Sequence, residues 1–208
     1  QPNNVFPLVV NRFNRTISFF AAFIVLAFVI MSAWWVYGRM QSRNIPILMY
    51  HRIGNEQQSV WWVPVTNFEN QIMFLKSQGY ESILPSDLVA YYRWAKPLPR
   101  KPIILTFDDG YLNSMQNAEP ILKKYGFRGI VYLVTEKIAE NDAERKEMEG
   151  TPTLIWPEIR AMYKRGTLTF GGHSRTHPNI LTLSEPYWEI RGCYTYIQKK
   201  GGFKPDGF

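Results

Sequence analysis

Cysteine and histidine are scarce in this chain of 208 residues, which has one cysteine and three histidines. The single cysteine, Cys193, cannot form an internal disulfide, so the sequence excludes a disulfide-stabilised scaffold and a zinc site built from clustered cysteines. Any metal ion would have to be held by histidine and carboxylate side chains. A content of 46% apolar and 20% charged residues disfavours a disordered chain or a coiled coil. The length suits one domain, or one domain with an appendage.

Acidic residues are also few, with 17 Asp and Glu against 24 Lys and Arg and a net charge of +7. The excess lies in the N-terminal half, because residues 1–104 carry ten basic and four acidic side chains. Four arginines bracket an apolar run there: Arg12, Arg15, Arg39 and Arg43. This pattern is typical of a membrane segment with basic flanks, and no basic-aromatic or helix-turn-helix motif is present. We therefore expect a membrane partner and no nucleic-acid partner.

The apolar run extends without a charge from Thr16 to Gly38. At about 1.5 Å per residue, a helix of this length spans a hydrocarbon layer of about 30 Å. The run is longer than the core of a signal peptide, about 7–15 residues, and no Ala-x-Ala-like cleavage site follows it. The sequence therefore predicts a flank over 1–15, one transmembrane helix over 16–38 and a single-pass membrane protein. Basic residues lie on both sides of the run, so they do not give its orientation.

Apolar runs and helical patterns alternate along the rest of the chain. Strands are predicted over 45–50, 80–84, 103–107, 129–134 and 167–170, and helices over 66–79, 85–92, 118–126 and 156–166. Strands that are apolar on both faces and separated by helices predict a parallel α/β fold. A proline-rich connection before residue 103 separates a linker and lead-in segment over 39–100 from a domain over 101–208.

Composition predicts the surroundings of two further segments. The stretch 136–150 is strongly charged, which predicts a solvated helix or excursion. A last helix is expected to follow residue 185 and to pack through its large apolar side chains, which are Tyr187, Trp188, Ile190 and Tyr194.

Polar clusters follow two of the predicted strands. The first is TFDDGY at 106–111, and the second is GGHSRTHP at 171–178. Ligands bind at the carboxyl ends of strands in parallel α/β folds, so both clusters lie where a site is expected. Adjacent carboxylates in an extended chain point in different directions, which lets one face a metal and the other a substrate. Histidines four residues apart can converge on one ion.

Each cluster taken alone is a weak signal. Asp-Asp-Gly often forms a turn or a helix cap, and His-x-x-x-His is often surface decoration. Their combination at two strand ends of one fold is more specific. One aspartate with two histidines forms a triad that leaves positions open for water and substrate and suits Zn²⁺, Fe²⁺ or Co²⁺.

These segments resemble a known family. TFDDGY at 106–111 looks like the first motif of the polysaccharide deacetylases, and HSRTHPN at 173–179 looks like their second. This carbohydrate esterase family, with its nodulation-type chitooligosaccharide deacetylase homology domain, includes chitin, peptidoglycan and poly-N-acetylglucosamine deacetylases. IPILMYHRIG at 45–54 resembles the lead-in of membrane-anchored bacterial members. The resemblance implies the N-terminal part of a distorted (β/α) barrel with an extracytoplasmic catalytic domain.

The resemblance also implies roles for single residues. Asp108 would be the general base, and Asp109, His173 and His177 would be ligands of a divalent metal, most often Zn²⁺. The implied reaction is metal-dependent hydrolysis of acetamide groups on N-acetylglucosamine-type glycans of the cell envelope. Neither the sequence nor the resemblance singles out a residue for substrate binding.

The chain departs from the family after the second motif. The stretch IQKKGGFKPDGF at 197–208 resembles the approach to a third motif, and the later motifs, which carry the general acid, are absent. We expect a C-terminally truncated deacetylase domain with the first two motifs only. His51 is a candidate for the acid by elimination, with a structural or capping role as the favoured alternative. Two other interpretations stay open: a non-catalytic carbohydrate- or metal-binding module, and a membrane scaffold whose deacetylase-like half binds a partner.

Overall fold

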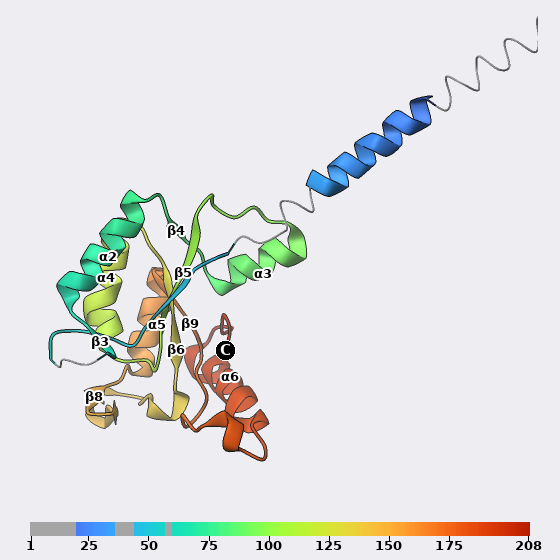
Figure 1. The fold of residues 1–208 in the computed structure, drawn as a ribbon. Helices are drawn as coiled ribbons and strands as arrows, with labels where there is room; N and C mark the ends of the chain where they lie inside the picture. The colour runs from blue at the N-terminus through green and yellow to red at the C-terminus, as the bar shows by residue number, and fades with distance from the viewer. Residues whose placement is uncertain (1–19, 36–43, 57–59) are drawn as a thin grey trace, which may run out of the picture. The chain divides into compact units, whose positions relative to one another are not determined.

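A computed structural model describes residues 20–35, 44–56 and 60–208, which divide into two compact units, Gln1–Asn44 and Ile45–Phe208 (Figure 1). In the first unit, residues 20–35 form a helix with most of its large apolar side chains exposed. No helix in the described part of the chain is both long and apolar enough to cross a membrane. The transmembrane helix predicted over 16–38 is thus not found in the described residues, which include only 20–35 of that span, and the predicted flank over 1–15 lies outside them.

The second unit is built on a parallel sheet. Its strands are β1 (Ile47–Tyr50), β4 (Glu81–Ser82), β5 (Pro102–Phe107), β6 (Gly129–Leu133) and β9 (Leu168–Gly172). They are ordered β1-β5-β6-β9, with β4 paired to the start of β5, and every pair is parallel. Every residue of β5 is buried, as expected for a strand covered on both faces. The parallel α/β prediction is confirmed, whereas the sheet does not close into a barrel within the described residues.

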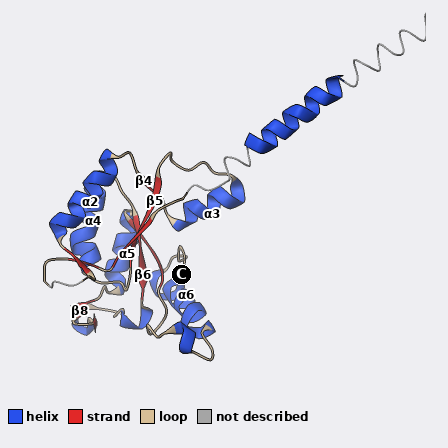
Figure 2. Cartoon of the chain, in the orientation of Figure 1, coloured by secondary structure: helices blue, strands red, loops and turns tan. Residues whose placement is uncertain are grey.

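Helices flank the sheet on both sides (Figure 2). They are α2 (Val65–Ser77), α3 (Pro85–Trp94), α4 (Glu119–Tyr125), α5 (Trp156–Arg165) and α6 (Tyr187–Gly201). Helix α2 packs against α4, while α5 and α6 both pack against β9. Helix α2 buries Phe68, Ile72 and Leu75, the three positions at helical spacing. The apolar stripe of the sequence therefore sets which face of this helix meets the core.

The ends of α5 show how local sequence fixes an element. Pro157 occupies the first turn, where its missing N–H costs nothing, and the Glu158 carboxylate accepts a hydrogen bond from the Ile155 amide at 3.0 Å. At the other end Gly166 adopts a left-handed conformation with φ of +78°. The helix thus starts and stops where the sequence predicts, and it delivers the chain to β9.

Short irregular elements connect the strands. A π-helix (Ser114–Ala118) lies between β5 and α4, and 3₁₀ turns follow β6 at Thr135–Lys137 and Asp142–Glu144. The charged stretch 136–150 is an excursion that ends in an antiparallel hairpin of β7 (Glu147–Met148) and β8 (Thr151–Pro152). Two further strands, β2 (Arg52–Ile53) and β3 (Trp62–Val63), pair in parallel beside the end of β1.

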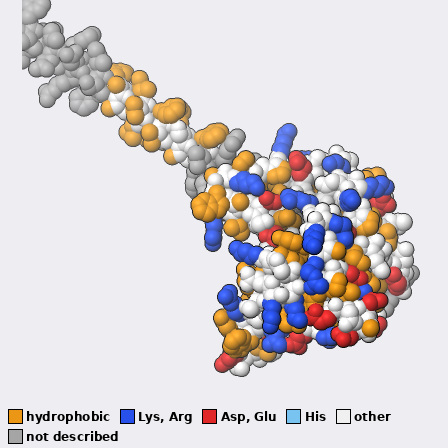
Figure 3. Space-filling model, turned by 180° about the vertical axis from the view of Figure 1, so that it is seen from behind, with side chains coloured by type: hydrophobic (Ala, Val, Ile, Leu, Met, Phe, Trp, Pro, Cys, Tyr) orange, Lys and Arg blue, Asp and Glu red, His pale blue; other side chains and the backbone are white. Residues whose placement is uncertain are grey.

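The surface of the molecule carries charges of both signs. On the face seen in Figure 3, Lys and Arg side chains are interspersed with apolar and acidic ones. Glu119 is an acidic side chain that lies in the interior, where it pairs with Arg165 through two hydrogen bonds, of 2.8 and 2.5 Å. This pair joins α4 to the end of α5.

Candidate active site

The carboxyl ends of three strands bring the candidate residues together. Asp108 and Asp109 directly follow β5, His173 directly follows β9, and His51 directly follows β1. Because these strands are parallel, their carboxyl ends share one edge of the sheet. All four side chains therefore lie at one edge of the sheet because they follow the carboxyl ends of parallel strands.

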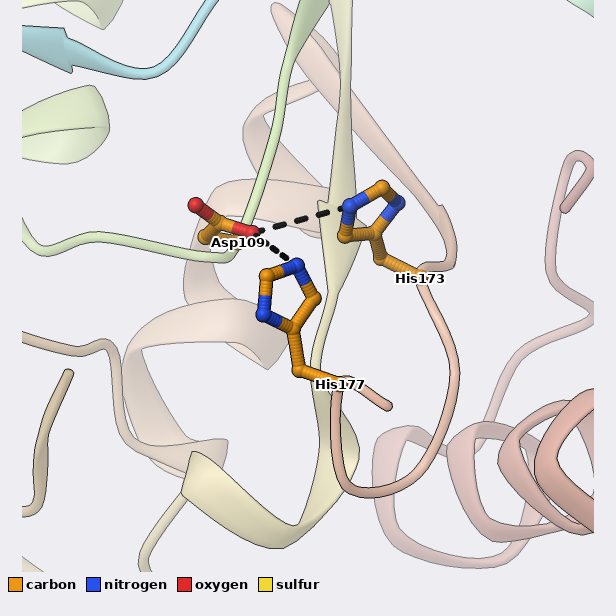
Figure 4. Close-up of side chains that lie close together, drawn as sticks. All are labelled: Asp109, His173 and His177. Carbon is orange, nitrogen blue, oxygen red and sulfur yellow. Dashed lines mark ion pairs between the residues drawn. The ribbon is translucent and has the colours of Figure 1, made fainter. Parts of the chain in front are cut away.

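Asp109, His173 and His177 form a compact cluster (Figure 4). The Asp109 Oδ1 atom lies 3.6 Å from His173 Nε2 and 3.5 Å from His177 Nε2. Two ligands that each lie about 2.1 Å from one tetrahedral ion are about 3.4 Å apart. The observed separations match that value, and the three ligand atoms all lie within 4.8 Å of one another. The structure thus brings together the three residues that the sequence analysis assigns to a metal.

The cluster also has the electrostatic character of a cation site. Asp109 is 4% exposed, and its Oδ1 atom is buried without a hydrogen-bond partner. An unpaired buried carboxylate oxygen is costly, and a bound cation would satisfy it. Burial lowers the pKa of His173, an effect that exceeds the opposite influence of Asp109. A neutral imidazole has the free lone pair that a metal ligand needs.

The backbone around the cluster is strained. Asp109, Ser174 and His177 have φ values of +75°, +73° and +67°. Such left-handed conformations in residues other than glycine cost on the order of 1–3 kcal/mol each and often occur at functional sites. All three residues lie in the two loops whose side chains form the cluster.

The loop between the two histidines is held by hydrogen bonds. The His177 amide donates to Ser174 Oγ at 2.9 Å, while the Glu189 carboxylate of α6 accepts from the Arg175 and Thr176 amides at 2.8 and 2.9 Å. Glu189 was missed by sequence reasoning, because nothing in its local pattern distinguishes it from a solvated helix residue. Glu189 lies 12 to 16 positions after the loop residues in the sequence, and only the fold brings it to them.

Asp108 lies beside the cluster and is 7% exposed. Burial raises its pKa from 3.8 to about 6; the Asp109 charge adds to this, whereas His51 and His177 lower it. The Asp108 amide donates to the Tyr50 carbonyl at 2.8 Å, which fixes the residue against the end of β1. A carboxylate with a pKa near neutrality can both accept and release a proton at physiological pH.

His51 belongs to the same edge of the sheet. Its charge acts on Asp108 and on Glu149, and its ring lies 4.7 Å from the ring of Trp61. Trp61 is half-exposed, whereas the neighbouring Trp62 is buried. Of these two neighbouring tryptophans, Trp61 thus lies at the surface beside His51 and Trp62 lies in the interior.

Comparison with known proteins gives this arrangement a family. The family model described as polysaccharide deacetylase matches residues 95–208. YxkH of Bacillus subtilis strain 168 is 34% identical over 111 residues, which cover 50% of this chain and 38% of that protein. The poly-β-1,6-N-acetyl-D-glucosamine N-deacetylase of Staphylococcus aureus MRSA252 is 26% identical over 145 residues, 69% of this chain and 48% of that enzyme. The chain therefore spans less than half the length of either relative.

Solved structures share the fold. The Streptococcus pyogenes deacetylase PplD in complex with acetate has a TM-score of 0.66 and 25% identity, covering 77% of this chain and 70% of that chain. IcaB from Ammonifex degensii has a TM-score of 0.68 and 21% identity, covering 79% and 72%. The first two motifs, their meeting at one sheet edge and a family match over more than half of the residues lead to one conclusion: this chain belongs to the polysaccharide deacetylase family.

Proposed function

We propose that the chain provides the metal-binding and proton-accepting part of an N-deacetylase active site that hydrolyses acetamide groups of N-acetylglucosamine-type glycans in the cell envelope. The observation that carries the proposal is the cluster of Asp109, His173 and His177 directly beside the buried Asp108. The Staphylococcus aureus relative is named for a poly-N-acetylglucosamine substrate, which supports this class of glycan.

Asp109, His173 and His177 would hold a divalent cation, and their nitrogen and oxygen donors suit Zn²⁺. When bound, such a cation supplies Lewis acidity, which polarises the acetamide carbonyl and lowers the pKa of a nearby water.

Asp108 acts as the general base in this proposal. Its carboxylate accepts a proton from the attacking water as the water oxygen bonds to the acetamide carbon. The pKa of about 6 keeps most Asp108 ionised at neutral pH while leaving it basic enough to accept the proton. The tetrahedral species then breaks its carbon–nitrogen bond and releases acetate.

The departing nitrogen needs a proton, and we propose that His51 donates it. A structural role for His51 is favoured from the sequence, but His51 follows Tyr50, which pairs with Phe107, the residue before Asp108. The imidazolium of His51 would protonate the amine, which leaves as the free amino sugar. Acid and base thus come from two adjacent strands.

The proposal extends to the fold and the location of the protein. The end of the chain hydrogen-bonds along β9, from the Asp206 amide to Phe170 at 2.8 Å and from the Gly172 amide to Gly207 at 3.0 Å. A further strand of a distorted (β/α) barrel would make such contacts. Attachment to the membrane, with the domain outside the cytoplasm, stays a prediction from the apolar run and the family resemblance.

The test combines metal content with acetate release. The intact native protein is stripped with a chelator, reloaded with Zn²⁺ and incubated with N-acetylglucosamine oligomers while acetate is measured. We expect release only after reloading. Asp108→Asn should bind Zn²⁺ but release no acetate, and His177→Ala should lose stoichiometric Zn²⁺. Sugar binding without acetate release by the reloaded wild-type protein would instead favour the non-catalytic binding module.

A further inference from the structure

Glu189 places its carboxylate against the loop between the two histidines of the cluster. The residue lies in the first turn of α6, and its Oε2 atom accepts hydrogen bonds from the Arg175 and Thr176 amides at 2.8 and 2.9 Å. Its Oε1 atom accepts from the Thr176 hydroxyl at 3.0 Å. Hydrogen bonds to an ionised acceptor are roughly twice as strong as those between neutral groups. Both oxygens of Glu189 thus bind this one loop.

The loop has a conformation that its contacts must hold. Ser174 and His177 have φ values of +73° and +67°, and such left-handed conformations persist only where the surrounding structure holds them. The Ser174 hydroxyl holds the end of the loop from within, because it accepts from the His177 amide at 2.9 Å. The two amides between these residues both donate to Glu189. Glu189 therefore holds the middle of the loop.

The same loop is fixed to the end of β6. The His173 amide donates to the Leu133 carbonyl at 2.9 Å, and the Arg175 carbonyl accepts from the Glu136 amide at 2.9 Å. Helix α6 also packs closely on the loop, since an added Cβ on Gly192 would lie 2.7 Å from Arg175 Cδ. Arg175 thus joins the turn after β6 through its carbonyl and α6 through its amide.

We propose that Glu189 is a positioning residue for the metal ligands His173 and His177. By holding the two amides between these histidines, its carboxylate keeps the loop in the conformation in which both Nε2 atoms lie within 3.6 Å of Asp109 Oδ1. Without that carboxylate, the loop can relax from its left-handed turns and the two imidazoles move apart. The inference rests on the proposed function only in taking the cluster as a metal site.

The expected effect on metal affinity follows from the place of Glu189 in the contacts. Partners that orient metal ligands typically change metal affinity about 10–100-fold when they are removed. Glu189 holds the backbone between the ligands and not the imidazoles themselves, so we expect the lower end of that range.

The test measures metal binding and not activity. The full chain is stripped of metal and titrated with Zn²⁺ in competition with a chelating dye, and with Co²⁺ while its d–d absorption is recorded. We expect Glu189→Ala to raise the Zn²⁺ Kd about 10-fold and to shift the Co²⁺ bands, because the two histidines lose their relative placement.

Glu189→Gln separates the hydrogen bonds from the charge. Its amide oxygen can accept from both backbone amides, and its amide nitrogen can donate to the Thr176 hydroxyl. It should therefore largely restore the affinity that Glu189→Ala loses. If the charge of Glu189 simply attracted the cation, the two variants would weaken binding equally, and that result would overturn the inference.

Asp87→Ala is the matched control. Asp87 also lies in the first turn of a helix, and its carboxylate accepts from the Leu84 amide and from the side chains of Arg128 and Lys96. Arg128 directly precedes β6, so this cluster lies at the amino ends of the strands and not at the metal site. Asp87→Ala should lower the melting temperature while the Zn²⁺ Kd and the Co²⁺ bands stay those of the wild type.

Glu189→Asp covers the case in which Glu189→Ala fails to fold. It keeps the charge but shortens the side chain by one methylene, so the carboxylate no longer reaches both amides, and the Zn²⁺ Kd should rise by a smaller factor. Wild-type Kd and Co²⁺ bands in whichever of these two variants folds would overturn the inference. If the wild-type chain itself bound neither metal, the proposed function would fail first, so the two failures are distinguishable.

Discussion

We expect the buried Asp108 carboxylate to lower the free energy of unfolding, and its replacement by a neutral side chain to raise it. Burial raises the pKa of Asp108 from 3.8 to about 6. A difference of about two pKa units, at about 1.4 kcal/mol each, corresponds to about 3 kcal/mol. We therefore expect Asp108→Asn to raise the free energy of unfolding of the metal-free protein at neutral pH by up to about 3 kcal/mol. In a chain of this size the melting temperature would rise by roughly 6–12 °C.

The pH dependence of this effect has a definite sign. Below pH 3.8 the carboxyl group is protonated in both the folded and the unfolded chain, so the penalty is absent. Between pH 3.8 and about 6 the unfolded chain releases its proton while the folded chain keeps it, so stability falls as pH rises. Above that range the penalty is complete. The Asp108→Asn variant should lack this decline.

Urea unfolding of the metal-free proteins across this pH range measures the difference directly. Metal must be absent because a cation at Asp109 would favour ionised Asp108 and reduce the penalty. Asp87→Asn is an opposite control: burial raises the pKa of Asp87, but the Leu84 amide, Arg128 and Lys96 together lower it more. Its loss should destabilise the protein. The reasoning would be refuted if Asp108→Asn unfolded at no higher urea concentration than the wild type at neutral pH and its free energy of unfolding changed with pH in the same way.

Three further perturbations test separate parts of the structure. Gly110→Ala should lower the melting temperature and weaken Zn²⁺ binding, because Gly110 has φ of +78° and an added Cβ would lie 2.9 Å from Leu133; an unchanged melting curve would contradict this. Glu119→Gln should lose about 1–3 kcal/mol in urea unfolding, since it weakens the hydrogen bonds between the buried Glu119 carboxylate and the partly exposed Arg165, and a loss near zero would show the pair to be dispensable. His51→Gln should lower the rate of acetate release about 10²–10⁴-fold with Zn²⁺ content unchanged, and a wild-type rate would exclude His51 as the acid.

The strand ends of the site could be predicted from the sequence because both signals are local. A continuous apolar run before Asp108 and another before His173 predict buried parallel strands, and parallel strands end at one edge. The convergence of Asp109 with the two histidines follows from those two facts. Their spacing to within a few tenths of an ångström depends on left-handed turns, which the sequence does not mark at Asp109, Ser174 or His177.

The packed face of α6 was wrongly predicted for an instructive reason. The large residues Tyr187 and Trp188 are about 60% exposed, while the helix buries Cys193, Ile197 and Gly201. An added Cβ on Gly172 of β9 would lie 2.7 Å from Cys193 Sγ, so the helix lies too close to the strand for a bulky side chain. Gly172, about 20 positions before Cys193, therefore determines which side chains of α6 can face the sheet. Hydrophobicity alone would place the larger side chains of Tyr187 and Trp188 there instead.

Contacts between distant segments account for the other residues that sequence reasoning missed. Arg52 forms an ion pair with Glu149 at 2.7 Å although the two residues are 97 positions apart, and nothing near either of them indicates the other. His51 could be proposed only by elimination, because its relation to Asp108 arises from the pairing of β1 with β5. Local patterns thus predict elements and motifs, whereas the partners of a site come from the order of the strands.

The order of the strands has a consequence for folding as well as for chemistry. Asp109 follows β5 and His173 follows β9, and β6 lies between these strands without contributing a ligand. A cation held by both loops would be a crosslink over the end of β6, closing a loop of more than 60 residues. Such a link restricts the unfolded chain and binds only the assembled sheet, so the free metal concentration would set how firmly β9 stays docked. A protein built this way would couple the integrity of its sheet to the supply of the ion.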